Sequence, residues 1–384
     1  MKRVGIYLDT SSSAGGLFQY SQSILDAFAK HNRRDYEVVI ITSDEEWKNY
    51  LKNSSFNLYN VKYPIISSLI SKFFVGFFFP AKLAVMLSKI FNPVVREIKN
   101  LNLDIIIFPN QDYLSFQLDT KTVSTIHDLM HIYESRFPEV SSGLRYFYRQ
   151  YRYKNICKFS NIILVDSDLG KNHVIESYDV DSNIIFSLPY VPPKYIYNNQ
   201  YYNLNLPEKF LFYPAQFWEH KNHSLLLKAL AMVKINHKDI KLMITGRENN
   251  LYKTIKALIK DLDLEKNVIF TGKIEDQHMS TYYKNARALI FPSFFGPTNI
   301  PPLEAIVCSC PMAVSDIYAM PDQLKDASIY FNPLSIDSIS EAIESLWIND
   351  SLCSDLVLNG MKASKSWNHE TFSEKLFQIL DSQN

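Results

Sequence analysis

Short apolar runs rich in β-branched residues alternate with helix-length amphipathic stretches along the whole sequence. This alternation is typical of parallel sheets whose strands are joined by helical crossovers, so it predicts an α/β fold. Six strand candidates lie in the first half, at residues 4–8, 37–42, 104–108, 123–127, 161–165 and 184–187. Six more lie in the second half, at residues 210–214, 240–245, 268–271, 288–291, 312–314 and 328–331.

A stretch rich in Pro, Tyr and Asn without periodicity, residues 188–207, separates the two series of strands. The 384 residues are also too many for one ordinary core. We therefore expect two Rossmann-like, doubly wound domains, an N-terminal one at 1–190 and a C-terminal one at 205–366. Ligands of such sheets bind at the carboxyl ends of the strands, here in a cleft that the two domains face. The last segment, 367–384, is expected to be a helix that returns to the first domain.

Charge and cysteine content exclude several classes of protein. Forty basic and forty acidic residues give no net charge that would draw the chain onto nucleic acid. The four cysteines lack the C-x-x-C spacing of zinc or redox motifs and are interpreted as reduced core thiols. The first residues lack the pattern of a signal peptide, which predicts a cytoplasmic protein.

The segment from 63 to 91 is very apolar and aromatic. Lys72, Pro80, Lys82 and Lys89 interrupt it, so it contains no uncharged stretch of about 18 residues that could span a bilayer. We favour a buried helix pair in the first domain. The alternative is an interfacial surface that makes peripheral contact with the inner face of the cytoplasmic membrane.

Polar motifs follow the strands of the first half. Gly15 and Gly16 come after the first strand, where they would let a ligand approach the backbone and a helix N-terminus. A plain strand-to-helix turn explains them equally well. His127 and Asp128 end the fourth strand, where the histidine could exchange a proton or hydrogen bond at a reacting centre and the aspartate could fix its tautomer. A structural histidine is the alternative.

The second half carries a lysine motif after its first strand. Lys221 and Asn222 stand just before a predicted helix, so the ammonium charge and the helix dipole together suit a diphosphate. A solvated surface lysine is the alternative.

A second motif in this half begins a helix with two prolines. Pro301 and Pro302 fit the first helical turn, and Asn299 can cap it. The amides of Asn299, Ile300 and Leu303 are then left for a phosphate. Glu304, one turn in, is placed to accept from a vicinal diol such as a nucleotide ribose.

Taken together, these motifs resemble the retaining glycosyltransferases of family 4, which have the GT-B fold, over essentially the whole chain. The resemblance rests on Gly15 and Gly16, His127 and Asp128 followed by Phe137, Pro138 and Glu139, the run 165–168, His220 to Asn222, Thr245 and Gly246, Phe270 to Gly272, and Pro301 to Ala305.

The resemblance implies that the domain at 1–190 lies on the acceptor side, that the domain at 205–366 binds the nucleotide sugar, and that each matching position has a role. Gly15 and Gly16 would line the donor phosphate and the acceptor side, His127 would lie at the sugar, Lys221 would bind the diphosphate and Glu304 the ribose. Lys273 and Ile274 would meet the nucleobase. Further donor-binding candidates are Asn222, Gly246, Arg247, Thr298, Asn299 and Ile300. The donor would be a nucleoside-diphosphate sugar, with no metal and no separate cofactor.

Two positions depart from the family pattern. Ala215 replaces a common arginine, and either Arg247 or His220 could supply the missing charge. Gly296 replaces the first of two glutamates, so Thr298 and Asn299 are expected to take over contacts near the donor sugar.

The resulting hypothesis is a retaining hexosyltransferase. It would move a sugar from a UDP- or GDP-sugar to a hydroxyl of a glycan acceptor in bacterial O-antigen or capsule synthesis. The resemblance to the family implies that this acceptor is lipid-linked. Two alternatives stay open: a nucleotide-sugar epimerase or hydrolase of the same fold, and a non-catalytic partner subunit, which Ala215 and Gly296 make conceivable.

Overall fold

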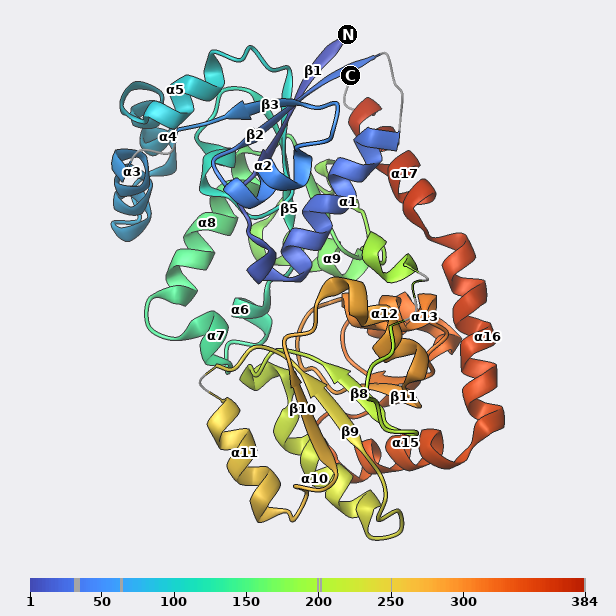
Figure 1. Ribbon diagram of the computed structural model, residues 1–384. Helices are drawn as coiled ribbons and strands as arrows, with labels where there is room; N and C mark the ends of the chain where they lie inside the picture. The colour runs from blue at the N-terminus through green and yellow to red at the C-terminus, as the bar shows by residue number, and fades with distance from the viewer. Residues whose placement is uncertain (31–34, 63–64, 199, 201, 250, 383–384) are drawn as a thin grey trace. The chain divides into compact units, whose positions relative to one another are not determined.

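The computed structural model describes residues 1–30, 35–62, 65–198, 200, 202–249 and 251–382. The chain forms two compact units (Figure 1). Unit 1 consists of Met1–Arg136, Val140–Pro189 and His369–Asn384, and unit 2 of Phe137–Glu139 and Tyr190–Asn368. Unit 1 is therefore assembled from segments that are distant in the sequence.

Unit 1 is built on a parallel sheet in which seven strands are described. They are β1 (Lys2–Leu8), β2 (Tyr36–Thr42), β3 (Asn57–Asn60), β4 (Ile105–Phe108), β5 (Lys121–Ile126), β6 (Ile162–Val165) and β7 (Ile185–Ser187). Their order is β3-β2-β1-β4-β5-β6-β7, and all neighbours run parallel. Apolar side chains on both faces bury strands such as β6, which explains the continuous apolar runs.

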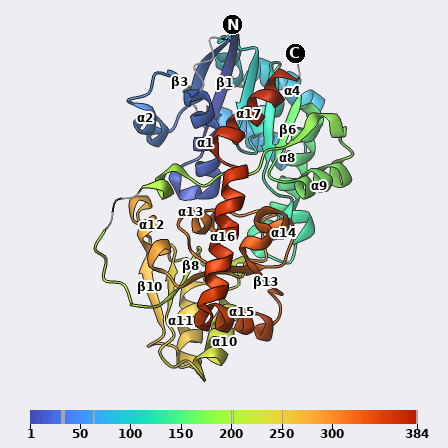
Figure 2. The ribbon, with the colours of Figure 1, turned by 90° about the vertical axis from the view of Figure 1, so that its right-hand side faces the viewer.

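Helices cover this sheet. They are α1 (Gly16–Lys30), α2 (Glu45–Leu51), α3 (Ile65–Gly76), α4 (Ala81–Phe91), α5 (Pro93–Lys99), α6 (Met130–Tyr133), α8 (Arg145–Phe159), α9 (Asp168–Tyr178) and α17 (His369–Asp381), together with α7 (Pro138–Ser141), whose first two residues group with unit 2. Helix α17 lies along α1 (Figures 1 and 2). The rings of Phe28 and Phe377 are 5.0 Å apart, and the Ser373 hydroxyl donates to the Ala27 carbonyl at 3.2 Å. The final helix thus completes the core of unit 1.

The apolar segment around residue 75 is a helix pair, as predicted, but our expectation that it is buried is wrong. Helices α3 and α4 expose many large apolar side chains; Ile65 is 80% exposed and Phe77 is 71% exposed. Hydrophobicity predicts that a residue will seek apolar surroundings, but it does not say that the surroundings lie inside the same chain. The predicted residues 63 and 64 lie outside the described part of the chain.

Unit 2 is built on a second parallel sheet, in which six strands are described. They are β8 (Leu211–Pro214), β9 (Leu242–Thr245), β10 (Val268–Gly272), β11 (Ala288–Phe291), β12 (Met312–Ser315) and β13 (Ile329–Phe331), in the order β10-β9-β8-β11-β12-β13. The helices are α10 (His223–Lys234), α11 (Tyr252–Asp261), α12 (Asp276–Asn285), α13 (Ile300–Val307), α14 (Met320–Leu324), α15 (Ile336–Ile348) and α16 (Asp350–Ser366). The predicted fold class, two parallel-sheet Rossmann-like domains, is confirmed.

Both sheets have a point where the strand order reverses. In unit 1 the chain returns to the sheet centre at β4, which pairs with β1, and in unit 2 at β11, which pairs with β8. In open α/β sheets, ligands bind outside the carboxyl ends of the strands at such a point. The loops that follow β1, β4, β8 and β11 are therefore the first places to look for a site.

Two other expectations can be compared with the structure. The four cysteines, Cys157, Cys308, Cys310 and Cys353, are all free and buried, as predicted. No helix in the described part of the chain has the length and hydropathy needed to cross a bilayer.

Candidate functional site

The loops after β8 and β11 meet at the reversal point of unit 2. The Lys221 ammonium donates to the Ser293 hydroxyl at 3.4 Å, and the backbone amide of Phe294 donates to the His220 carbonyl at 2.8 Å. The ammonium also lies 5.2 Å from the centre of the Phe291 ring. The Tyr213 hydroxyl donates to the Lys221 carbonyl and so fixes the turn. The lysine is thus fixed at the carboxyl end of the central strands, where a parallel sheet binds ligands.

Asn222, the residue after this lysine, has a structural role. Its backbone is left-handed, with φ of 57°, a conformation that asparagine tolerates better than most residues. Its buried side chain donates to the Pro333 carbonyl at 2.8 Å. The asparagine therefore turns the chain from the lysine loop into α10 and ties that turn to the segment after β13.

His220 is paired with a carboxylate from a distant segment. Its Nδ1 lies 3.1 Å from Oε1 of Glu139, and its backbone amide donates to the same oxygen at 3.3 Å. Burial opposes the charged form of Glu139, but the hydrogen bonds with His220 outweigh it and lower the pKa of Glu139 to about 2. Phe137 anchors this segment by stacking on Phe294, with ring centres 5.6 Å apart. The segment Phe137–Glu139 is thus built into unit 2 next to the lysine loop.

The loops after β9 and β10 approach the same edge. A side chain at Gly246 would place its Cβ only 2.5 Å from the Ala215 carbonyl oxygen, so glycine is required there. Arg247 and Lys273 are exposed beyond this contact, whereas Ile274 packs against the core of unit 2. Ala215 itself is buried, and its amide donates to the Thr245 carbonyl.

The start of α13 contradicts two expectations, that the Asn299 side chain caps the helix and that its backbone amide is left for a phosphate. Asn299 occupies the N-cap position, but its side chain does not cap the helix; it donates to the Phe295 carbonyl at 3.2 Å. Its backbone amide already donates to Oε1 of Gln323 at 3.1 Å. Gly296 has φ of 88°, which disfavours a glutamate at this position, and Thr298 and Ile300 are buried. The side chain of Asn299 therefore shapes the loop before the helix.

Glu304 is buried and engaged by two tyrosines. It is 3% exposed, and its two oxygens accept hydrogen bonds from the hydroxyls of Tyr195 and Tyr283, the latter at 2.7 Å. Burial raises the pKa of Glu304 to about 7, although both hydrogen bonds favour the charged form. The two phenol groups occupy the positions in which we expected a vicinal diol.

In unit 1, the loops after β1 and β4 are joined by hydrogen bonds. The side-chain amide of Asn110 donates to the Thr10 hydroxyl at 2.6 Å and to the Ser21 hydroxyl at 3.1 Å. Gly15 adopts φ of 60°, and a Cβ added there would meet no atom within 4 Å. Gly16 is the first residue of α1. The glycine loop is thus open at the reversal point of the first sheet.

His127 lies at the end of β5 and is 4% exposed. Its Nε2 is 2.9 Å from the Pro109 carbonyl oxygen; since a carbonyl only accepts, Nε2 carries the proton. Burial lowers the pKa of His127 to about 4, so the ring is neutral at pH 7. The Asp128 carboxylate instead accepts from the Met130 amide at 3.0 Å and lies 3.7 Å from the Arg149 guanidinium. The tautomer is therefore set by a backbone carbonyl.

The site residues group within each unit. Unit 2 brings Lys221 and His220 to the loop that leads into α13, while Asn222 and Ile274 serve packing and turns. Sequence reasoning did not select Ser293, Glu139, Tyr195 or Tyr283. Glu139 stands inside a motif quoted above, and Ser293 comes two residues after β11, so its position after a strand could have pointed to it. Tyr195 comes from the aperiodic stretch and carried no signal. Among the described residues, no group of three or more His, Cys, Asp or Glu is arranged to hold a metal ion.

Known proteins are similar in sequence to part of this chain. It is 26% identical to the O-antigen chain mannosyltransferase RfbU of Salmonella typhimurium over 58% of the chain and 60% of the relative, so the chain spans less than two thirds of that protein. It is 23% identical to O-antigen chain mannosyltransferase B of Escherichia coli over 67% of the chain and 69% of the relative.

Solved structures show the same fold. The Anabaena protein HepE, solved in complex with UDP and glucose, superposes with a TM-score of 0.74 over 100% of both chains at 14% identity. Such neighbours share the GT-B architecture, which confirms the predicted fold. The family model described as Glycosyl transferases group 1 matches residues 198–363. Most of unit 2 is therefore similar to the domain that this family model describes.

Proposed function

We propose that the protein is a retaining glycosyltransferase of family 4. It transfers a hexose from a UDP- or GDP-sugar to a hydroxyl of a glycan acceptor in bacterial O-antigen or capsule synthesis. The group 1 domain and the names of the two mannosyltransferase relatives support transfer of a sugar, and they favour mannose among the hexoses. HepE, with the same fold, binds UDP and glucose, which supports a nucleoside-diphosphate donor.

The observation that carries the proposal is the position of Lys221. Its ammonium is held between the loops after β8 and β11, at the reversal point where a parallel sheet receives its ligand. Breaking the bond between a sugar and a diphosphate leaves negative charge on the phosphate. A fixed cation at that place stabilises the charge more in the transition state than in the ground state, which accelerates the reaction.

His127 has a different role in this proposal. Because its ring is neutral and Nε2 donates to the Pro109 carbonyl, the lone pair lies on Nδ1. A neutral imidazole in this tautomer can accept a hydrogen bond from a hydroxyl of the transferred sugar. It orients the sugar and does not have to give up a proton.

Glu304 limits how the ribose can be bound. An ionised carboxylate has about four lone-pair positions, and two are used by Tyr195 and Tyr283. The side chain is nearly inaccessible, so a ribose hydroxyl reaches it only by taking the place of a tyrosine hydroxyl. We propose that Tyr195, which belongs to the segment after β7, is the one displaced.

Isothermal titration calorimetry with UDP and GDP tests the donor site. Replacing Lys221 by Ala should weaken binding of the matching nucleotide by about 1.5 to 3 kcal/mol, the range for losing a charged hydrogen bond. Lys228→Ala, which removes an exposed lysine from the following helix, is the control and should bind like the wild type. Failure of both nucleotides to bind in the millimolar range would sink the donor assignment.

The stereochemistry and the need for an acceptor are tested separately. With a mannosyl or glucosyl donor and a glycan acceptor, nuclear magnetic resonance of the product should show the same anomeric configuration as the donor. Rapid hydrolysis or epimerisation of the donor without acceptor would instead favour the epimerase or hydrolase alternative.

A further inference from the structure

Helices α3 and α4 of unit 1 carry a continuous set of exposed apolar side chains. The exposed residues are Ile65, Ile66, Leu69, Phe73, Phe77, Phe78, Leu83, Met86, Ile90 and Phe91. We call this set the α3–α4 surface. Single exposed apolar residues are common on proteins, but eight large ones on two adjoining helices and two more in the turn between them mark a surface that is covered when the protein works.

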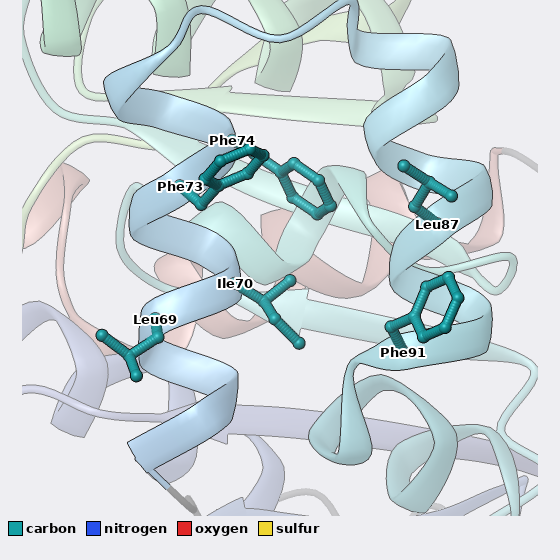
Figure 3. Close-up of a pocket in the computed structure, with 6 residues that line it drawn as sticks. All are labelled: Leu69, Ile70, Phe73, Phe74, Leu87 and Phe91. Atoms are coloured by element: carbon teal, nitrogen blue, oxygen red, sulfur yellow. The ribbon is translucent and has the colours of Figure 1, made fainter.

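A groove runs between the two helices. Figure 3 shows Ile70 and Phe74 of α3 pointing across this space towards Leu87 and Phe91 of α4. Leu69 and Phe73 complete its apolar lining, and its volume is about 640 Å³. Cavities of this size commonly hold an organic ligand, and this one offers no polar side chain to bind a polar group. Its chemistry suits a hydrocarbon chain.

Basic residues predominate in the segment that forms the surface. Between Trp47 and Arg96 the sequence contains no Asp or Glu, but seven basic residues: Lys48, Lys52, Lys62, Lys72, Lys82, Lys89 and Arg96. Lys62, just before α3, and Lys82, in the first turn of α4, are exposed. Two carboxylates lie nearby and already have partners: Asp119 pairs with Lys89, and Glu97 accepts from the Tyr59 hydroxyl.

Helix α8 extends the same pattern. It packs against α3, and the Tyr151 hydroxyl donates to the Phe79 carbonyl at 2.7 Å. Residues 140–165 contain five basic residues and no acidic one, and Leu144 and Phe147 are exposed near the start of the helix. Exposed apolar side chains among an excess of basic residues are therefore a property of this whole region of unit 1.

These features distinguish the possible occupants. A second copy of this chain, docked through the same surface on both molecules, would place cationic residues opposite one another. A polar protein partner gives no reason to exclude every carboxylate from 50 residues of sequence. An anionic bilayer gives such a reason, because its phosphates attract lysines and repel carboxylates while its acyl region receives apolar side chains.

We infer that the α3–α4 surface docks on an anionic phospholipid bilayer. The helices lie in the plane of the interface, since α3 and α4 have only 12 and 11 residues. Phe77 and Phe91 enter the acyl boundary, the lysines meet lipid phosphates, and a lipid chain occupies the groove. This binding does not depend on the sugar donor.

Vesicle flotation of the full chain tests the inference. The protein should float with phosphatidylcholine vesicles that contain phosphatidylglycerol, much less with phosphatidylcholine alone, and less again at high salt. The Phe77→Ser, Phe91→Ser double variant should bind the anionic vesicles at least about tenfold more weakly, because two large apolar side chains no longer leave water. The matched control is Ile235→Ser, Ile348→Ser, which removes two exposed apolar residues from unit 2 and should change nothing.

The charge is tested with lysines. Lys82→Gln should lower the affinity for anionic vesicles roughly fivefold, the effect of one lysine near a charged membrane surface. Lys362→Gln, an exposed lysine of α16, should bind like the wild type. Equal binding by wild type and the double phenylalanine variant, or no preference for the anionic vesicles, overturns the inference.

A direct readout covers variants that fold poorly. The fluorescence of a Phe77→Trp variant should be quenched by brominated lipids, whereas that of Ile235→Trp should not. Lack of quenching at position 77, or concentration-dependent dimers that hide this surface in sedimentation, contradicts bilayer docking. Nucleotide binding measured on the same variants should be unchanged, which separates this result from the fate of the donor assignment.

Discussion

Two carboxylates of unit 2, the partly buried Glu139 and the buried Glu304, have opposite acid–base behaviour. Glu139 is held charged by His220, and Glu304 is made harder to ionise by burial. The difference comes from burial, which is nearly complete at Glu304, and from the partner: His220 also attracts the charge of Glu139, whereas the two tyrosines give Glu304 only neutral hydrogen bonds. Each glutamate therefore leaves its own mark on the pH dependence of stability.

Glu139 should stabilise the fold above about pH 4.5. Its pKa is lower in the folded chain, so its contribution is present above the unfolded value and is lost as the pH falls towards about 2. In Glu139→Gln the acid arm of the unfolding free energy, measured by urea titration at several pH values, should be flatter. Glu134→Gln removes a carboxylate that pairs with Arg136 and is the control. An unchanged acid arm in Glu139→Gln would contradict the pairing.

Glu304 should act in the opposite direction. Because its pKa is raised from 4.5 to about 7, the folded state holds a proton that the unfolded state has lost. The unfolding free energy should fall by roughly 3 kcal/mol between about pH 4.5 and pH 7 and then level off. Glu304→Gln cannot titrate, so the difference between wild type and variant across this range isolates the glutamate. A constant difference from pH 5 to pH 8 would show that the carboxylate is not buried as described.

At the scale of elements, the conformation of the loops after β8 and β9 depends on the close approach of their backbones at Ala215 and Gly246. Gly246→Ala would place a methyl group 2.5 Å from the Ala215 carbonyl oxygen, in rigid backbone. We expect a loss of about 1 to 3 kcal/mol in stability, the usual range for overpacking, together with weaker nucleotide binding as the loop after β8 moves. Gly360→Ala in α16 would place a methyl group near the side chains of Ile306 and Ala327, with the nearest atom at 3.3 Å, and should leave nucleotide binding unchanged in the same calorimetric assay.

The elements could be predicted from sequence where burial on both faces leaves an apolar run. All twelve strand candidates are strands. One strand of the structure was not predicted. It is β3 (Asn57–Asn60), which lies at the edge of the sheet and is mostly exposed, so its sequence has no apolar run to detect. Helices α3 and α4 were recognised as helices but assigned to the core, because composition does not identify the partner of an apolar face.

The candidate site was predictable only where chemistry follows a strand directly. Lys221 and His127 stand next to strand ends, and parallel topology alone brings such residues to one edge. The pairing of Glu304 with Tyr195 joins residues that are distant in the sequence, and the tyrosine comes from a stretch without periodicity. No local pattern could have indicated it.

At the scale of the molecule, unit 1 depends on a helix that arrives late in the sequence. Phe377→Ala removes a fully buried ring that packs on Phe28 and Tyr36 and should destabilise unit 1 by about 3 to 5 kcal/mol. Hydrogen exchange should become faster in β1 and α1 but stay unchanged in β8 and β11. Leu358→Ala, which truncates an exposed residue of α16, is the control and should change neither. Uniform acceleration in both sheets would mean that the units unfold together.

The division of the chain has a consequence for its synthesis on the ribosome. Apart from Phe137–Glu139, unit 2 is one uninterrupted segment, so it can acquire its structure as soon as that segment has left the exit tunnel. Unit 1 is translated first, yet the apolar side chains that α17 covers, such as Phe28, stay exposed until translation has passed through all of unit 2. The unit that is synthesised first is thus completed last, and in that interval a chaperone can bind its exposed apolar side chains.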